Sequence, residues 1–281
     1  MRGFVLKCAG KAPDGVVPAV DSARVRRHEA STLCPGPVGD RHSPGAPDVV
    51  RSPFAETLKA QNLIRLDIIS DVACPWCFIG KAYLDRALEA HPGHPFGIEW
   101  HPFQLNPDMP AGGMDRAAYL EAKFGGRDTA LRAYAPLIEH AATAGVELNL
   151  AAVRRTPNTL DAHRVIHWAG LEGRQTHAVA GLFRALWQEG RDIGDLPTLA
   201  DIAASAGLDR AMTLRLLQSD ADSDDIRARD QHARDRGVSG VPTFIIANRH
   251  VLQGAQPSDV WARVIGEVTA RLADAATGAG E

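Results

Sequence analysis

The chain has 281 residues, of which 45% are hydrophobic, and its formal net charge is −3. This length allows one or two domains with a substantial core, and the slightly acidic balance excludes nucleic acid as an expected partner. No run approaches the roughly 18 continuous apolar residues of a membrane span, so no membrane partner is expected, and four cysteines in so long a chain do not form a disulfide scaffold.

Residues 1–62 differ in composition from the rest of the chain. They contain seven prolines among scattered Arg and Gly and show no helical or strand periodicity. Such a segment buries too little apolar surface to order itself, so we expect either a disordered extension or a start codon assigned too far upstream. The apolar run at the N-terminus is too short for a signal peptide and is interrupted by Lys7, which indicates a cytoplasmic location. Disulfides in that compartment are mostly transient and catalytic.

From residue 63 the pattern predicts a strand, a helix and a second strand. Ile64 to Ile69 is an apolar run typical of a buried strand, and Pro75 to about Ala90 has the spacing of an amphipathic helix. Residues 96–101 then alternate apolar and polar positions, which is strand periodicity. This βαβ unit carries Cys74-Pro-Trp-Cys77 at its first turn, a combination typical of thioredoxin-like proteins in the cytosol.

The Cys-x-x-Cys motif predicts a redox-active dithiol. Cys74 would be the N-cap of the helix and Pro75 its first residue, where a missing N–H costs nothing. The positive end of the helix and the N–H groups of Trp76 and Cys77 would stabilise a thiolate at Cys74 and lower its pKa. Cys77, one turn later, can attack a mixed disulfide formed at Cys74 and release the product. Trp76 is interpreted either as an exposed aromatic side chain or as a peptide contact.

Two other interpretations of the Cys pair are weaker. A structural zinc site needs four ligands, usually in two close pairs, whereas Cys8 and Cys34 lie far apart in the N-terminal segment. A purely structural disulfide this short is not expected at a helix start in the cytosol. We therefore predict no metal site. Two acidic neighbours, Asp67 and Asp71, are interpreted either as a proton shuttle for Cys77 or as structural groups, Asp71 then being capping or solvated.

After a loop rich in Pro and Gly, residues 114–237 have helical spacing interrupted by glycines. This segment is too long for a crossover connection, so it predicts an inserted helical subdomain. The sheet then resumes with an antiparallel hairpin within residues 240–253, and an amphipathic helix from Pro257 follows it. The predicted fold class is α/β: a thioredoxin-like fold with a mixed central sheet, formed by residues 63–113 and 238–274 and interrupted by a large all-helical insertion.

Motifs along residues 63–270 make the chain similar to one family. They are Ser70-Asp71 with Cys74 to Lys81, Pro102 to Pro110, Asn158 to His163, Gly237 to Phe244 and Gly254 to Pro257. In these motifs and their order the chain resembles the DsbA family of thiol–disulfide oxidoreductases, specifically its cytosolic FrnE-like branch. The resemblance implies a thioredoxin fold with a helical insertion and says nothing about residues 1–62.

The resemblance also implies roles for residues outside the Cys pair. The Val241–Pro242 bond is expected to be cis and to pack against the pair, where the exposed Val241 backbone would pair with an incoming extended peptide. Pro75 and Trp76, between the cysteines, are expected to support the active site. Asn158 and His163 are expected to line the cleft that faces Cys74 and to contact the substrate.

The function that the resemblance implies is thiol–disulfide exchange of the oxidase or isomerase type. The partner would be a protein or small molecule that carries a thiol or a disulfide; no bound cofactor is expected, and glutathione is left open as a redox partner. One alternative is a glutathione-dependent enzyme of the 2-hydroxychromene-2-carboxylate isomerase or kappa-class transferase type, in which a single Ser typically replaces the Cys pair. A second alternative is a non-catalytic peptide-binding module. The sequence predicts neither the direction of exchange, the physiological substrate nor the oligomeric state.

Overall fold

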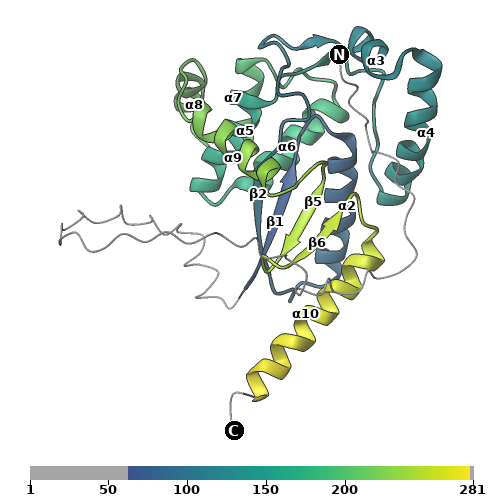
Figure 1. The fold of residues 1–281 in the computed structure, drawn as a ribbon. Helices are drawn as coiled ribbons and strands as arrows, with labels where there is room; N and C mark the ends of the chain where they lie inside the picture. Colours follow the sequence, from purple (N-terminus) through teal and green to yellow (C-terminus); the bar gives the residue numbers. More distant parts are fainter. Residues whose placement is uncertain (1–62, 279–281) are drawn as a thin grey trace, which may run out of the picture. The chain divides into compact units, whose positions relative to one another are not determined.

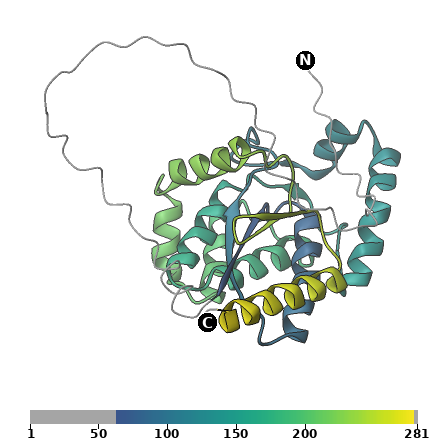
Figure 2. The same cartoon turned by 60° about the horizontal axis from the view of Figure 1, so that its bottom comes forward.

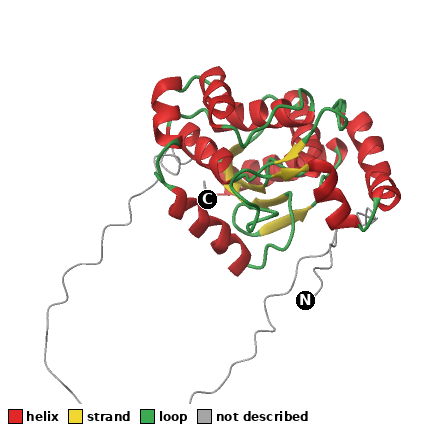
Figure 3. Ribbon diagram, turned by 90° about the horizontal axis from the view of Figure 1, so that it is seen from above, coloured by secondary structure: helices red, strands yellow, loops and turns green. Residues whose placement is uncertain are grey.

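The computed structural model describes residues 63–278. The expectation of a disordered or wrongly assigned extension at residues 1–62 lies outside this range. Within it, the chain forms an α/β fold in which helices surround a central sheet (Figure 3). None of the helices in this range is long and apolar enough to cross a membrane.

Four strands form a mixed sheet in the order β2-β1-β5-β6 (Figure 1). β1 (Ile64–Ser70) lies beside β2 (Phe96–Pro102), and the two strands are parallel. β5 (Thr243–Ile246) pairs antiparallel with β1, and β6 (His250–Gln253) pairs antiparallel with β5. The predicted mixed sheet is therefore confirmed.

β1 is apolar along most of its length because both faces of the sheet are covered there. Leu66 and Ile68 are 0% and 1% exposed, and Ile69, which points to the opposite face, is buried as well. A strand buried on both faces shows a continuous apolar run rather than strict alternation. β6 is an edge strand, and its Val251 is exposed.

Two helices of the thioredoxin-like part, α2 (Pro75–Ala90) and α10 (Ser258–Gly278), pack against each other (Figure 2). α2 has the bounds that the sequence predicts, since a proline at the first position favours a helix start there. From α10, the buried Trp261 meets Phe244 of β5 edge to face, with ring centroids 4.8 Å apart. α10 continues beyond residue 274, where the sequence places the end of the domain.

Between β2 and β5 the chain forms the helical insertion. It also contains a short pairing that the sequence does not predict, because β3 (Met114–Asp115) lies antiparallel to β4 (Arg155–Thr156). Strands of this length are too short to show periodicity. The helices of the insertion are α3 (Arg116–Phe124), α4 (Arg127–Ala144), α5 (Leu160–Leu171), α6 (Gln175–Trp187), α7 (Leu196–Ser205), α8 (Arg210–Leu217) and α9 (Ser223–Asp235).

The insertion and the thioredoxin-like part share one hydrophobic core. α5, α6 and α9 pack against β2, and α4 packs against α2. Phe78 of α2 stacks on Phe183 of α6, with ring centroids 5.3 Å apart. The indole N–H of the fully buried Trp187 donates a hydrogen bond to the Val72 carbonyl at 2.9 Å, two residues before the first cysteine of the pair. The insertion is therefore built against the end of the sheet that carries the cysteines.

Candidate active site

The Cys pair lies between the carboxyl end of β1 and the first turn of α2. Cys74 is the N-cap residue in an extended conformation, with φ −94° and ψ 113°, and Pro75 follows it in the first turn. The Cys74 N–H donates to the Asp71 carbonyl at 2.9 Å, and the Cys77 N–H donates to the Cys74 carbonyl at 3.1 Å. Both cysteines are free thiols, Cys74 being 4% and Cys77 1% exposed. The sequence prediction of two neighbouring thiols at a helix start agrees with this geometry.

The two thiols differ in acidity. A hydrogen bond with the Cys77 side chain holds the pKa of Cys74 below its ordinary value, supported by the N–H groups of Cys77 and Trp76 and opposed by burial and by Asp71. Burial raises the pKa of Cys77 well above its ordinary value, and the neighbouring Cys74 thiolate adds to this effect. Cys74 is therefore the thiol that ionises first, and Cys77 stays protonated while Cys74 carries a charge.

Val241 and Pro242 come to the Cys pair from the segment before β5. The Cys74 sulfur lies 3.7 Å from the Val241 carbonyl oxygen. The Val241–Pro242 peptide bond is cis. α2 approaches the same segment so closely that a Cβ added to Gly80 would lie 3.1 Å from Pro242 Cγ. The two residues that the resemblance places beside the dithiol thus contact Cys74 and α2.

Trp76 is half-buried and packs against α4. Its indole meets the His140 ring edge to face, with ring centroids 5.2 Å apart. The interpretation of Trp76 as an exposed aromatic side chain is therefore wrong, and its role as a peptide contact stays a prediction.

Asp71 is buried rather than solvated. It is 1% exposed, and its carboxylate accepts hydrogen bonds from the N–H groups of Ala73 at 3.0 Å and Leu105 at 2.7 Å. Burial raises the pKa of Asp71, against the opposing effects of His163 and of these N–H groups. The Asp71 carboxylate in turn opposes ionisation of Cys74. Asp71 thus ties the active-site turn to the loop after β2 and limits the acidity of the first cysteine.

His163 of α5 lies against Asp71. Its Nε2 atom is 3.8 Å from Asp71 Oδ1, and the side chain is 3% exposed. This nitrogen has no hydrogen-bond partner among the residues that the structure describes. Burial lowers the pKa of His163, so the neutral imidazole is favoured at pH 7. The fold thus places the histidine against the buried carboxylate of the active-site turn.

Comparison with known proteins identifies the family. Residues 65–266 match the family model described as the DSBA-like thioredoxin domain. The chain belongs to this family. The uncharacterised protein YwbO of Bacillus subtilis is 30% identical over 205 residues, which cover 73% of this chain and 96% of the relative. The crystal structure of a probable DsbA oxidoreductase from Streptomyces coelicolor is 29% identical, with a TM-score of 0.65, and the match covers 73% of this chain and 89% of that chain.

The DsbA-like fold is shared with more distant proteins. The cytosolic disulfide reductase DsbM from Pseudomonas aeruginosa, in a structure with GSH, is 23% identical, with a TM-score of 0.51 over 74% of this chain and 99% of that chain. At this identity the similarity shows the fold alone. The DsbA family and its thioredoxin-like fold are therefore shown for this chain, while the FrnE-like branch stays a prediction.

The Asn158 side chain is hydrogen-bonded to other groups of the protein. Its amide N–H donates to the Met109 carbonyl at 2.6 Å, and its amide oxygen accepts from the Leu160 N–H at 2.9 Å and the Gln104 side chain at 3.4 Å. These bonds fasten the loop after β2 to the start of α5. The predicted contact of Asn158 with substrate stays a prediction, and these internal bonds leave it little free hydrogen-bonding capacity.

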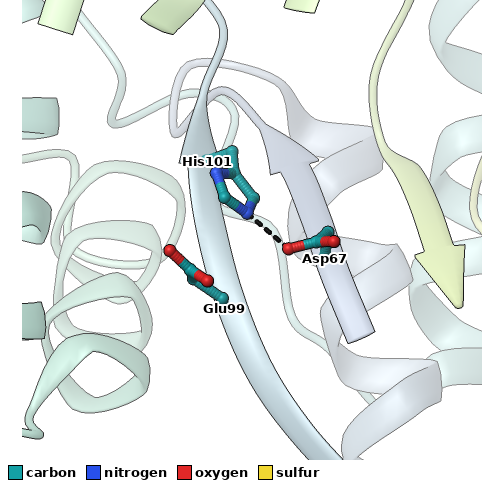
Figure 4. Close-up of side chains that lie close together, drawn as sticks. All are labelled: Asp67, Glu99 and His101. Atoms are coloured by element: carbon teal, nitrogen blue, oxygen red, sulfur yellow. Dashed lines mark hydrogen bonds and ion pairs between the residues drawn. The ribbon is translucent and has the colours of Figure 1, made fainter. Parts of the chain in front are cut away.

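Asp67 belongs to a charge cluster on β1 and β2 rather than to the dithiol. Asp67, Glu99 and His101 place ligand atoms within 4.8 Å of one another, as a metal ion would require (Figure 4). Arg65 already supplies the positive charge, since its Nε lies 2.6 Å from Asp67 and its Nη2 lies 3.0 Å from Glu99. Burial would raise the pKa of Asp67, but His101 and Arg65 hold it below its ordinary value. These contacts favour a protein ion-pair network over a metal site and account for Asp67 without a proton-shuttle role.

A group of cationic and aromatic side chains near the cysteine end of the fold is not predicted from the sequence. Arg116, Tyr119 and Lys123 of α3 are spaced three and four residues apart, and Tyr134 of α4 contacts the first of them. The shared helix face was the available signal. Its connection to the active-site turn arises only in the fold, through Trp187 and the Val72 carbonyl.

Proposed function

We propose that the chain is a thiol–disulfide oxidoreductase, of the oxidase or isomerase type, that works through Cys74 and Cys77. The observation that carries this proposal is the geometry of two adjacent, buried free thiols at the start of α2, with Cys74 as the N-cap residue. In this setting the pKa of Cys74 is lowered and that of Cys77 is raised. A lowered pKa makes Cys74 the better nucleophile and the better leaving group, while a raised pKa keeps Cys77 protonated. Membership of the DsbA-like family and the position of Val241 beside the Cys74 sulfur support the same conclusion.

In the reducing direction the Cys74 thiolate attacks one sulfur of a substrate disulfide. A bond forms between Cys74 and that sulfur, and the other substrate sulfur leaves as a thiolate. Cys77 then loses its proton and attacks the Cys74 sulfur, which releases the second substrate thiolate and leaves a Cys74–Cys77 disulfide. Once Cys74 is in the mixed disulfide it carries no charge, so one of the causes that raise the pKa of Cys77 is removed.

In the oxidising direction the same steps run in reverse. A substrate thiolate attacks the Cys74 sulfur of the Cys74–Cys77 disulfide and expels the Cys77 thiolate. A second substrate thiolate then attacks the substrate sulfur of the mixed disulfide and expels Cys74, so the substrate gains a disulfide and the enzyme gains a dithiol. Low basicity of Cys74 favours this release, because a less basic thiolate leaves faster.

A glutathione redox titration tests the proposal. The purified chain is equilibrated over a series of GSH/GSSG ratios, and mass spectrometry of trapped peptides gives the state of Cys74 and Cys77. We expect one two-electron step between the dithiol and the intramolecular disulfide, whose midpoint separates an oxidant from a reductant. In Cys77→Ser the step should be replaced by a persistent mixed disulfide at Cys74, and in Cys74→Ser by no disulfide between the two positions.

The titration, together with activity and peptide-binding assays of the same variants, separates the two alternatives. Glutathione bound without a two-electron step, together with turnover that survives Cys77→Ser, would favour the glutathione-dependent isomerase or transferase. Peptide binding that persists in Cys74→Ser, with no thiol-dependent turnover in the parent chain, would favour the peptide-binding module. The intact Cys-Pro-Trp-Cys sequence supports neither alternative over the oxidoreductase.

The proposed partner is a protein or small molecule that carries a thiol or a disulfide, with glutathione as a candidate redox partner and no bound cofactor. The presence of GSH in the structure of a disulfide reductase with the same fold supports testing glutathione first. A cytoplasmic location is proposed with it, and cell fractionation with an antibody to the chain would check this assignment.

A further inference from the structure

Arg116 at the start of α3 is a cation held by neutral groups. Its Nη2 donates to the Tyr134 hydroxyl at 2.6 Å and its Nη1 donates to the Thr156 hydroxyl at 3.2 Å. Its guanidinium carbon lies 5.4 Å from the centre of the Trp187 ring. A guanidinium has five N–H donors, so these bonds leave donors free for a ligand.

A second cation, Lys123, lies on the same face of α3. Its ammonium donates to the Tyr119 hydroxyl at 2.6 Å and lies 5.1 Å from the centre of that ring. Within residues 63–278, neither Arg116 nor Lys123 has a carboxylate at ion-pair distance. By contrast, two other arginines of the insertion are paired with carboxylates. These pairs are Arg164–Asp161 and Arg234–Asp230.

Two chains of contacts connect this cationic face to the active-site turn before Cys74. Trp187, which lies beneath Arg116, donates to the carbonyl of Val72 in the active-site turn. The Tyr119 hydroxyl donates to Asn106 at 3.1 Å, in the loop whose neighbouring N–H binds Asp71. Figure 1 shows α3 at the end of the sheet where α2 begins.

Electrostatics agree with this placement. Burial raises the pKa of Tyr134, and the charge of the Cys74 thiolate raises it further, whereas Arg116 acts in the opposite direction. The Tyr134 hydroxyl thus lies within electrostatic range of both the nucleophile and the guanidinium. By geometry, an anion held at Arg116 would lie across Trp187 from the Val72 carbonyl, in the turn that ends at Cys74.

We propose that Arg116 and Lys123 form a carboxylate-binding subsite for a small thiol or disulfide substrate while the substrate sulfur reacts at Cys74. The planar donors of a guanidinium match the two oxygens of a carboxylate, and the lysine adds a second positive charge. Substrates with a carboxylate a few bonds from the sulfur are selected over neutral or cationic ones. The inference rests on the proposed disulfide exchange and names its substrate class.

The test measures the charge selectivity of mixed-disulfide formation. In a Cys77→Ser background, the Cys74 thiolate attacks one sulfur of a symmetric disulfide, the other half leaves as a thiolate, and the product is trapped. The probes are 3,3′-dithiodipropionate, 2-hydroxyethyl disulfide and cystamine, which are anionic, neutral and cationic. Each rate constant, measured by mass spectrometry, is divided by that of the same disulfide with a neutral model thiol, which removes differences in intrinsic reactivity.

We expect the normalised rates to fall in the order anionic, neutral, cationic. Arg116→Gln should lower the ratio of the anionic to the neutral rate by about three- to fivefold, as expected for loss of one partly exposed ion pair. Lys123→Gln should lower it in the same direction, and Arg116→Lys should retain most of it. The matched control is Arg215→Gln, which removes one exposed positive charge from α8, on the other side of the insertion from α3 (Figure 1).

The outcomes separate the subsite from the chemistry. The subsite is overturned if the ratio of the anionic to the neutral rate is unchanged in Arg116→Gln, or if it falls equally in Arg215→Gln. In either case, a mixed disulfide between Cys74 and the neutral probe would still support the proposed function. If none of the three disulfides modifies Cys74, the proposed function itself fails. Far-UV circular dichroism of each variant accompanies the rates, because an unfolded chain exposes Cys74 without the subsite and would also lower the ratio.

Discussion

At the scale of single residues, the reactivity of this chain depends on neighbours that act on two thiols in opposite ways. Cys74 receives hydrogen bonds from the Cys77 thiol and from the first-turn N–H groups, while Cys77 is desolvated and faces the Cys74 charge. Asp71 works against the Cys74 thiolate. The pKa of Cys74 therefore depends on two opposing effects: hydrogen-bond donors at the start of α2 lower it, and the buried Asp71 carboxylate raises it. Substitutions can remove either effect without the other.

Removing the thiol donor should raise the pKa of Cys74. Cys77→Ala removes the hydrogen bond to the thiolate, so the pH profile of Cys74 alkylation by iodoacetamide should move upward and the rate at pH 7 should fall roughly three- to tenfold. A tenfold change in rate corresponds to about 1.4 kcal/mol, the size expected for one hydrogen bond to a charged group. Cys77→Ser, which keeps an O–H donor, is the matched control and should shift the profile less. Identical profiles for the two variants would show that the Cys77 side chain does not stabilise the thiolate.

The buried Asp71–His163 contact should be visible in the pH dependence of stability. Burial lowers the pKa of His163 below its ordinary value of 6.5, so the folded chain binds this proton less tightly than the unfolded chain does. The corresponding contribution to the free energy of unfolding is fully present above pH 6.5 and is lost as the pH falls through the pKa of the folded state. Asp71 has the opposite sign, because its raised pKa gives a contribution that is present at low pH and is lost as the pH rises above 3.8.

His163→Gln should therefore weaken the loss of stability between pH 7.5 and pH 5. Urea denaturation at the two pH values gives the difference in the free energy of unfolding, and this difference should be smaller in the variant than in the parent chain. His177→Gln is the control, since His177 is exposed on α6 and should leave the difference unchanged. A difference in His163→Gln as large as in the parent would contradict the buried, neutral histidine.

At the scale of elements, the sequence predicts the parts whose signals are local. The bounds of α2 follow from the proline at its first position and from its apolar spacing, and the β5–β6 hairpin follows from two apolar runs around a tight turn. The burial of Asp71 and its contact with His163 join positions far apart in the chain, so no local spacing encodes them. The β3–β4 pairing and the contacts that connect Arg116 through Trp187 to the active-site turn escape prediction for the same reason.

Gly80 is an element-scale feature, because it sets how closely α2 approaches the segment before β5. A Cβ at this position would lie 3.1 Å from Pro242 Cγ and 3.4 Å from Phe244 Cζ. Replacing a mid-helix glycine by alanine normally gains up to about 1 kcal/mol, but here the added methyl group overpacks a buried contact. We expect Gly80→Ala to lower the free energy of unfolding by about 1 kcal/mol or more.

Gly266→Ala in α10 provides the comparison for Gly80→Ala, because an added Cβ there meets nothing within 4 Å. It should raise the free energy of unfolding by about 0.5–1 kcal/mol in the same urea denaturation experiment. Equal gains in both variants would mean that α2 can move away from Pro242 at no cost.

At the scale of the whole molecule, the described residues form the sheet, the dithiol and a core that the insertion and the thioredoxin-like part share. Trp187 and Phe183 of the insertion pack toward the active-site turn and α2, and Trp261 covers β5. Neither part can lose its structure without exposing apolar surface of the other. One cooperative unfolding transition is expected for residues 63–278 as a consequence.

This shared core gives a prediction for the N-terminal segment, whose own structure lies outside the described residues. A chain that lacks residues 1–60 keeps every strand of the sheet and all five tryptophans, so tryptophan fluorescence reports the same core in the truncated and full chains. We expect urea transitions followed by fluorescence and by far-UV circular dichroism to coincide in both chains, with equal midpoints. The rate of mixed-disulfide formation at Cys74 should also be equal, because β1, α2 and the Val241–Pro242 segment, which surround the Cys pair, all remain in the truncated chain. Loss of the cooperative transition in the truncated chain would instead make the segment part of the folding unit, whereas a slower reaction with an unchanged transition would place it at the active site.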